Sequence, residues 1–331
     1  MIFEALPTTP RSDELVDQAF SRAARAGRAK RGVEAQQSML QTASNVLSDN
    51  LANVVTAWPD FDEVDPFYYE LADAVLRTAL RGHGEHEPGV DALRQSLAEL
   101  SWASQKTKEL GREYIGRLSG DLDAARKTRK QGFARMASVV EEVGADLELV
   151  GAAREALKVL PDIRPDGPTV VVAGYPNVGK SSFVNAVTNA RNEIAAYPFT
   201  TRGVRVGHFE RDRVRYQIVD TPGLLDRPAD ERNDIEAQAV SALTHLADCV
   251  LFLVDASEEC GYPLADQLVL RDSVAEQFPD VPVLTVCNKA DRSTDVDADL
   301  YMSITEGENV DGVLDAAVAA IGYEPELPFE G

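Results

Sequence analysis

Two hydrophobic patterns divide this chain near residue 165. Over the first 160 residues, apolar side chains recur at steps of three and four residues, which is the period of an amphipathic helix. One such seam comprises Phe133, Met136, Val140, Val143, Leu147, Val150 and Leu157. The pattern predicts helices at residues 11–31, 34–56, 67–81, 90–118 and 121–160, with the last two antiparallel.

The second half alternates short apolar runs with helical segments. Continuous apolar runs are typical of strands that are buried on both faces of a parallel sheet. They predict strands near residues 169–174, 203–209, 214–220, 249–255, 281–287 and 300–303, and helices near 181–188, 231–247, 263–277 and 309–321. The predicted fold class is therefore α + α/β, with a helical bundle at residues 1–160, a proline-rich linker at 161–168, and a doubly wound, mostly parallel sheet at 169–331.

A glycine-rich run follows the first predicted strand and opens the next helix. Its residues are Gly174, Tyr175, Pro176, Asn177, Val178, Gly179, Lys180, Ser181 and Ser182. The run fits the Gly-x4-Gly-Lys-Ser phosphate loop, whose backbone N–H groups curl around the β-phosphate of a nucleotide at a helix N-terminus. We expect Lys180 to bridge the β- and γ-phosphates and the Ser181 hydroxyl to bind Mg²⁺.

A second motif ends another predicted strand and reads Asp220, Thr221, Pro222 and Gly223. Asp220 would contact Mg²⁺, directly or through water, and the Gly223 N–H would meet the γ-phosphate. Between the two motifs lie Thr200 and Thr201, and one of them should bind Mg²⁺ only when the γ-phosphate is present. Thr201 is favoured over Thr200. The alternative is that both threonines simply begin the next strand.

A third motif follows a third strand and reads Asn288, Lys289, Ala290 and Asp291. The Asp291 carboxylate can accept hydrogen bonds from guanine N1–H and the exocyclic amine, a pair that adenine cannot match. The stem of Lys289 would cover the base, and Ser303 begins a weaker match to a final base loop. The three motifs in this order predict a Ras-like P-loop GTPase domain that hydrolyses GTP to GDP with Mg²⁺.

Long segments outside these motifs resemble one family. They run through residues 197–209, 220–228, 233–239, 243–250 and 255–261. Together with the motif order and Asn177, they resemble the nucleolar GTP-binding family, a branch of the Obg-type GTPases. The resemblance implies a GTPase that assists assembly of the large ribosomal subunit and docks on ribosomal RNA of the pre-ribosomal particle through its helical bundle. Eukaryotic members continue well past the GTPase domain, whereas this chain stops at Gly331, so the resemblance does not extend to any role carried by that extension.

Features around the phosphate loop also bear on hydrolysis. Leu224 stands where many GTPases carry a glutamine that orients the attacking water, so unassisted turnover should be slow, about 10⁻⁴ per second. In several related GTPases the residue that matches Asn177 resembles a potassium ligand, which implies K⁺ as a further cofactor. The alternative is that Asn177 shapes the loop by a hydrogen bond. The candidate catalytic residues are thus Asn177, Lys180, Thr201 and Gly223.

The net charge of −22 is unexpected for a protein that binds RNA, because binding requires neutralising phosphates. Residues 1–166 carry a balance of −6 and residues 167–331 a balance of −16. Arginines outnumber lysines by 25 to 8, and this acidic composition resembles that of proteins from halophilic archaea. At molar salt the screening length is about 3 Å, so acidity does not exclude RNA. The alternative is a signalling or trafficking switch whose helical bundle binds a protein.

Two basic stretches stand out in the helical half. They comprise Arg22, Arg25, Arg28, Lys30 and Arg31, then Arg126, Lys127, Arg129, Lys130 and Arg135. Like charges repel one another unless a ligand offsets them, so these residues are the candidate RNA contacts. The alternative is a solvated helix face whose charges pair with neighbouring acids.

The remaining side chains predict little further chemistry. The chain starts without a basic segment followed by a long apolar one, and its longest apolar run is only strand length, so we expect a cytoplasmic protein without membrane contact. Cys249, Cys260 and Cys287 show no metal spacing and should be reduced core thiols. His83 and His86 are better explained as loop residues than as a metal site. The expected oligomeric state is a monomer.

Overall fold

The computed structural model describes residues 3, 6–83, 87–158, 160, 163–188, 193–195, 204–221, 223–226, 232 and 234–323. The chain folds into two compact units. The helical unit comprises residues 2–64 and 75–158, and the sheet unit comprises residue 1 with residues 65–74 and 159–331. Part of the helical half of the sequence thus belongs to the sheet unit.

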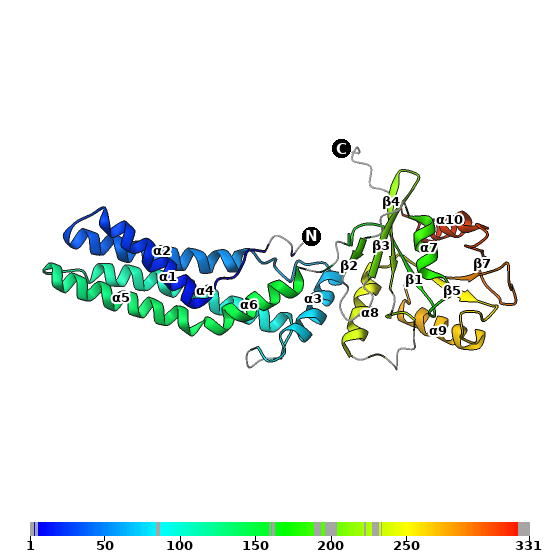
Figure 1. The fold of residues 1–331 in the computed structure, drawn as a ribbon, viewed down its shortest axis with the longest axis horizontal. Helices are drawn as coiled ribbons and strands as arrows, with labels where there is room; N and C mark the ends of the chain where they lie inside the picture. The colour runs from blue at the N-terminus through cyan, green and yellow to red at the C-terminus, as the bar shows by residue number, and fades with distance from the viewer. Residues whose placement is uncertain are drawn as a thin grey trace. The chain divides into compact units, whose positions relative to one another are not determined.

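Six helices precede the sheet in the described residues (Figure 1). They are α1 (Ser12–Arg28), α2 (Gly32–Thr56), α3 (Pro66–Ala79), α4 (Val90–Gly116), α5 (Leu122–Glu142) and α6 (Gly144–Leu157). Aspartates stabilise the first turns of two of them. The Asp65 carboxylate accepts from the Phe67 N–H at 2.9 Å, and the Asp121 carboxylate accepts from the Ala124 N–H at 2.8 Å.

The predicted helix at residues 121–160 is wrong as a single element. α5 ends at Glu142 and α6 begins at Gly144, because Val143 departs from helical geometry with φ −96° and ψ 19°. Glycine has a low helix propensity, and a β-branched residue precedes it here. The buried apolar positions of the seam nevertheless continue on both sides of Val143. The hydrophobic pattern therefore did not reveal the break.

Close helix contacts form the core of the helical unit. α2 packs against α1, α4 and α5. Gly132 of α5 approaches its neighbours so closely that a Cβ there would lie 2.8 Å from Leu40 and 3.0 Å from Tyr114. Phe20 of α1 stacks on Phe133 of α5 with ring centroids 4.3 Å apart. In this arrangement the α1–α2 turn and the α4–α5 turn lie at the same end of the unit (Figure 1).

Seven strands of the described residues form one sheet in the order β2-β3-β4-β1-β5-β6-β7. They are β1 (Thr169–Ala173), β2 (Glu193–Ala195), β3 (Val204–Arg211), β4 (Val214–Asp220), β5 (Cys249–Asp255), β6 (Val283–Asn288) and β7 (Leu300–Tyr301). The pairs from β4 through β7 are parallel, and β2 and β3 add antiparallel pairs at one edge. β1 and β5 are buried along their whole length, as expected of central strands. The predicted mostly parallel sheet is confirmed.

The helices of the sheet unit alternate with the strands. They are α7 (Lys180–Val187), α8 (Asp234–Leu246), α9 (Leu264–Gln277) and α10 (Val310–Ile321). Two strand predictions differ from the structure. The pattern predicts no strand at residues 193–195, because a three-residue edge strand offers no apolar run. The strand predicted at 300–303 ends at Tyr301, and Ser303 instead pairs with Glu308 in an isolated bridge.

The start of α3 and the linker are both tied into the sheet unit. The Tyr68 hydroxyl donates to the Ile163 carbonyl at 2.5 Å and accepts from the Ile163 N–H at 3.1 Å. The Gln217 side chain of β4 accepts from the Arg164 N–H at 2.9 Å and donates to the Arg164 carbonyl at 2.7 Å. These paired bonds fix the linker against the sheet and against residues 65–74.

Candidate nucleotide-binding site

The predicted motifs meet at one edge of the sheet. β1, β4, β5 and β6 are parallel neighbours, so their carboxyl ends share that edge. The glycine-rich run leaves β1, Asp220 ends β4, Asp255 ends β5 and Asn288 ends β6. Open α/β sheets bind their ligands at this edge, so the topology assembles one candidate site from distant parts of the chain.

Two glycines shape the phosphate loop between β1 and α7. Gly174 has a φ of 129°, and a Cβ there would lie 2.4 Å from the Leu253 carbonyl oxygen. Gly179 has a φ of 108°, and a Cβ there would lie 2.2 Å from the Asn288 side-chain amide. A side chain at either position would strain the backbone and collide with a neighbour. Asn177 also adopts the left-handed conformation, with a φ of 65°, which asparagine tolerates better than most residues.

Lys180 is the first residue of α7, and only 8% of its surface is exposed. Its ammonium donates to the Gly174 carbonyl at 2.6 Å and to the Tyr175 carbonyl at 2.9 Å. Burial lowers the pKa of Lys180, and the negative charges of Asp226 and Asp220 oppose that shift. The loop's own carbonyls therefore hold the ammonium at the loop.

Ser181 and Asp220, the predicted metal ligands, lie together. The Ser181 hydroxyl donates to Oδ2 of Asp220 at 2.5 Å, and Asp220 is fully buried. The buried Thr221 hydroxyl next to Asp220 has no hydrogen-bond partner among the described residues. Hydroxyl and carboxylate oxygens are ligands that a hard cation such as Mg²⁺ prefers. The residues present therefore fit a magnesium ion.

The segment that follows β4 folds back onto the phosphate loop. The Gly223 N–H donates to Oδ2 of Asp226 at 2.9 Å. The Gly174 N–H donates to the Leu225 carbonyl at 3.2 Å, and the Leu225 side chain is fully buried. The N–H group that was predicted to meet a γ-phosphate is thus bonded to a carboxylate of the protein.

Asn288 and Asp291 form the part of the site predicted to bind guanine. The Asn288 amide donates to the Val178 carbonyl at 2.8 Å and so links β6 to the phosphate loop. Oδ1 of Asp291 accepts from the Ser303 hydroxyl at 2.6 Å, and the Asp291 side chain is 22% exposed. The structure therefore brings together two predicted base contacts that are separated in sequence.

The other predicted site residues differ in exposure or lie outside the described residues. Val178 is buried, Tyr175 and Pro176 are half-buried, and Asn177 and Ser182 are exposed. Thr200, Thr201 and Pro222 lie outside the described residues. The Mg²⁺ contact of Thr201 therefore stays a prediction.

Two family models match this chain. The NOG1 N-terminal helical domain matches residues 3–164, and the nucleolar GTP-binding protein 1 (NOG1) model matches residues 234–291. The chain belongs to the nucleolar GTP-binding protein 1 family. Together with the fold, membership in the NOG1 family supports a GTP-binding protein with a GTPase domain.

Three curated relatives match over most of this chain. An uncharacterised protein of Methanocaldococcus jannaschii is 37% identical over 87% of this chain and 81% of its own length. Nucleolar GTP-binding protein 1 is 34% identical in Drosophila melanogaster and 32% identical in Saccharomyces cerevisiae, over 83% and 80% of this chain. The chain spans only 41% and 40% of those two proteins. A crystal structure of the Plasmodium falciparum NOG1 protein is 32% identical, with a TM-score of 0.45, over 49% of this chain and 90% of that one.

A buried carboxylate that belongs to none of the predicted motifs also lies in this candidate site. Oδ2 of Asp255 lies 2.6 Å from the Lys289 ammonium, and Asp255 is fully buried. Asp255 also accepts from the Ser257 N–H and hydroxyl and from the Cys260 N–H. Burial alone favours a higher pKa for Asp255, but the hydrogen bonds from Lys289 and Ser257 outweigh it and lower the pKa. A signal existed, because Asp255 ends a buried strand just as Asp220 does.

Gln267 and two tyrosines continue this network toward the phosphate loop. The Gln267 side chain of α9 accepts from the Asp255 N–H at 2.8 Å and donates to the Tyr262 carbonyl at 2.9 Å. The Tyr262 ring stacks on Tyr175 of the phosphate loop with centroids 4.3 Å apart. The base and phosphate motifs are therefore connected through residues that no motif spacing marks.

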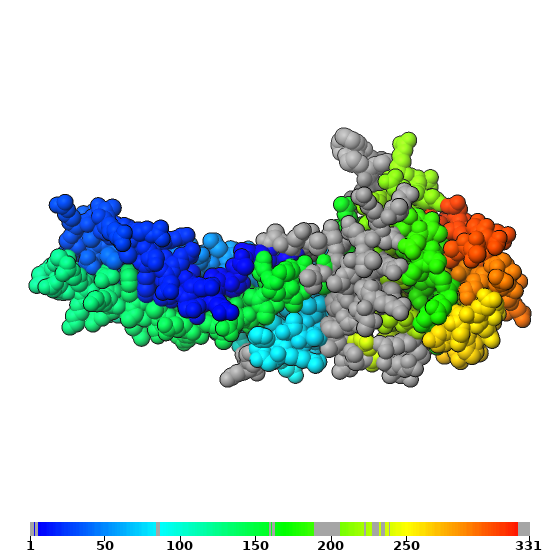
Figure 2. Space-filling view, viewed as in Figure 1, coloured from blue at the N-terminus to red at the C-terminus, as the bar shows by residue number. Residues whose placement is uncertain are grey.

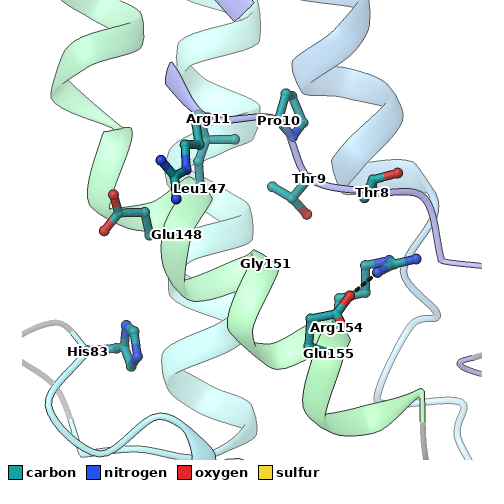
Figure 3. Close-up of a pocket in the computed structure, with 10 residues that line it drawn as sticks. All are labelled: Thr8, Thr9, Pro10, Arg11, His83, Leu147, Glu148, Gly151, Arg154 and Glu155. Carbon is teal, nitrogen blue, oxygen red and sulfur yellow. Dashed lines mark hydrogen bonds and ion pairs between the residues drawn. The ribbon is translucent and has the colours of Figure 1, made fainter. Parts of the chain in front are cut away.

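A separate cavity of about 530 Å³ lies in the helical unit (Figure 3). The N-terminal segment, α6 and His83 contribute to its wall. Arg154 donates from Nε to the Leu6 carbonyl at 2.8 Å and pairs with Glu155. These charges in the wall neutralise one another, and none of the predicted nucleotide-site residues lines the cavity.

The three cysteines lie in the core, as predicted. Cys249, Cys260 and Cys287 are buried and form no disulfide. Burial, aided by the charge of Asp248, raises the pKa of the Cys249 thiol to about 12, which makes it unreactive. Within the described residues, no group of three or more histidine, cysteine or acidic side chains is arranged to hold a metal ion, and no helix is long and apolar enough to cross a membrane.

Proposed function

We propose that this protein binds GTP at the carboxyl edge of its sheet and hydrolyses it slowly to GDP and phosphate. The observation that carries the proposal is the convergence of three contacts at that edge. They are the Lys180 ammonium on the loop carbonyls, the Ser181–Asp220 pair and the Asp291–Ser303 pair. These supply, in one place, a cation, a metal-binding pair and a guanine acceptor.

Base selection in the proposal depends on Asp291. Its carboxylate, oriented by the Ser303 hydroxyl, accepts from both guanine N1–H and the exocyclic amine. Adenine leaves this acceptor incompletely paired, and a site built around such hydrogen bonds strongly rejects the wrong base. The Lys289 stem covers the base plane while Asp255 holds its ammonium.

Phosphate binding in the proposal uses the loop N–H groups and Lys180. Lys180 exchanges the Gly174 and Tyr175 carbonyls for the β- and γ-phosphate oxygens. Mg²⁺, bound by Ser181 and Asp220 with Thr201 as a further ligand, would neutralise charge that develops on the phosphates. Leu224 is fully buried and apolar, so hydrolysis needs help from a partner or from K⁺ near the exposed Asn177.

We further propose that the helical unit binds RNA of the large ribosomal subunit during its assembly. Both predicted basic stretches lie at the end of the unit formed by the α1–α2 and α4–α5 turns, which Figures 1 and 2 show at the same extremity. Residues 22–34 and 108–135, which form that end, contain thirteen basic and five acidic residues. Every basic side chain among them except Arg129 is exposed. This excess of positive charge, in a chain of net charge −22, favours binding to phosphates.

Ion pairs account for only part of this basic end. Lys30 pairs with Glu34 at 2.9 Å and Arg126 with Asp123 at 3.1 Å, and Arg117 pairs with Glu113. The five acids cannot neutralise thirteen cations, so the alternative of a fully paired solvated face fits less well.

We also propose that the protein acts as a monomer in the cytoplasm of an archaeal cell with a high internal salt concentration.

Crosslinking of protein to RNA in cells, followed by sequencing, tests the ribosomal role. Wild type is compared with Lys180→Ala and with the basic-end variant Lys127→Gln/Lys130→Gln. The control is Arg81→Gln/Arg94→Gln, which removes the same charge from residues of the helical unit that lie outside the basic end. We expect large-subunit ribosomal RNA with wild type and the control, and reduced recovery with the other two. No RNA above background with wild type would favour the alternative of a signalling switch that binds a protein.

A further inference from the structure

We propose that Asp226 is a specificity-determining residue that competes with the γ-phosphate and thereby sets the ratio of GTP to GDP affinity. The inference rests on the proposed function of the nucleotide site. It goes beyond that function by assigning a role to a side chain that none of the three motifs includes.

The first observation is the bond made by Gly223. Its N–H is the group expected to meet the γ-phosphate, and it donates to Oδ2 of Asp226 at 2.9 Å. A backbone N–H carries a single hydrogen, so it cannot serve two anionic acceptors at full strength. A carboxylate oxygen resembles a phosphate oxygen in charge and in accepting such bonds. A γ-phosphate that takes this donor must therefore displace Asp226.

The second observation concerns the ammonium of Lys180, the other predicted γ-phosphate contact. Burial lowers the pKa of Lys180, and among the charges that oppose this shift Asp226 has the largest effect, ahead of Asp220. The negative charge of Asp226 thus favours the charged form of Lys180. The direct contact of Asp226 is with the Gly223 N–H, and its charge in addition acts on the second group expected to hold the γ-phosphate.

The third observation is that the turn carrying Asp226 is fixed. The Leu225 carbonyl accepts from the Gly174 N–H at 3.2 Å, and the Leu224 N–H donates to the Thr221 carbonyl at 3.2 Å. Leu224 and Leu225 are both fully buried. Packing and backbone bonds therefore hold the backbone next to Asp226 against the phosphate loop, so a γ-phosphate would displace the side chain rather than the turn.

These contacts act differently on the two nucleotides. GDP ends at its β-phosphate and leaves the Gly223 N–H to Asp226. GTP brings a third phosphate whose negative charge repels the carboxylate and whose oxygens need the same donors. Discrimination between ligands is a difference of affinities, and a competing group that affects only one ligand changes that difference. Asp226 should therefore weaken GTP binding relative to GDP binding.

Equilibrium titration of the full chain with fluorescent GDP and a fluorescent non-hydrolysable GTP analogue, both with Mg²⁺, tests this inference. In Asp226→Ala the Kd for the triphosphate should fall about tenfold, the worth of one charge-assisted hydrogen bond, while the Kd for GDP changes by less than about twofold. Asp226→Asn retains an acceptor but loses the charge, so its effect should be smaller and in the same direction. Asp311→Asn is the control, because it removes one exposed carboxylate that pairs with Arg211 and should leave the ratio unchanged.

Equal changes in both dissociation constants, or no change in either, would overturn the role of Asp226. Thermal unfolding of the same samples shows whether each variant is folded, and the near-isosteric Asp226→Asn keeps the test valid if Asp226→Ala is not. If wild type binds neither nucleotide, the proposed function itself fails. If wild type binds both and the ratio in Asp226→Ala equals that of wild type, only the inference fails.

Discussion

Removal of the Asp255 carboxylate should destabilise the sheet unit much more than removal of an exposed carboxylate. Asp255 is fully buried at the end of β5 and accepts from the Lys289 ammonium at 2.6 Å. Its carboxylate also accepts three hydrogen bonds from Ser257 and Cys260. In Asp255→Ala all of these donors lose their acceptor while they remain largely shielded from water.

The size of the effect follows from the burial of the two partners. Removing one partner of a buried ion pair costs about 3–5 kcal/mol. The Lys289 side chain is 23% exposed, so its ammonium can turn partly toward solvent. We therefore expect the lower end of that range, about 3 kcal/mol. At about 2–4 °C per kcal/mol for a unit of this size, Tm should fall by about 6–12 °C.

Thermal unfolding followed by circular dichroism measures this effect in the full chain at one KCl concentration. Asp311→Ala is the matched control, because it removes the same charge from an ion pair at 2.6 Å whose acid side chain is 90% exposed. Exposed pairs contribute little, so the control should shift Tm by no more than about 2 °C. Equal shifts for the two variants would refute the claim that the buried network around Asp255 stabilises the site.

Two further predictions concern pH and potassium. The pKa of Asp255 is lower in the folded protein than its value of about 3.9 in the unfolded chain. The stabilisation by its carboxylate is therefore present above that unfolded pKa and is lost as the pH falls through the folded pKa. The Tm difference between wild type and Asp255→Ala should accordingly shrink below about pH 4. A difference that stays constant from neutral to acidic pH would contradict this. GTP turnover should be faster in KCl than in NaCl at equal ionic strength, and Asn177→Ala should remove the difference. Equal rates for wild type in the two salts would exclude the potassium role.

The central strands and the three motifs could be predicted because their signals are local. A buried parallel strand is an apolar run, and a phosphate loop is a fixed spacing of residues such as Gly179 and Lys180. The break at Val143 was not predictable from periodicity, since the apolar seam crosses it without interruption. The edge strand β2 was missed because its three residues depend on pairing with β3 rather than on an apolar run of their own.

Tertiary contacts limited what could be predicted of the site. Ser181 and Asp220 were expected to meet because each follows from a motif with a known place at the sheet edge. Asp255 and Asp226 belong to no such motif, and their importance depends on which donors the fold brings to them. The gathering of two basic stretches at one end of the helical unit likewise depends on helix directions that composition does not contain.

Nucleotide competition tests the central claim most directly. Fluorescent GDP bound to the full chain with Mg²⁺ would be displaced by unlabelled GTP or ATP, in wild type and in Asp291→Ala. We expect GTP to displace the label from wild type and ATP not to do so at the same concentrations. Asp291→Ala should weaken guanine-nucleotide binding by at least about tenfold. Displacement by ATP as readily as by GTP, or full affinity in Asp291→Ala, would contradict the assignment of this edge of the sheet as a guanine-nucleotide site.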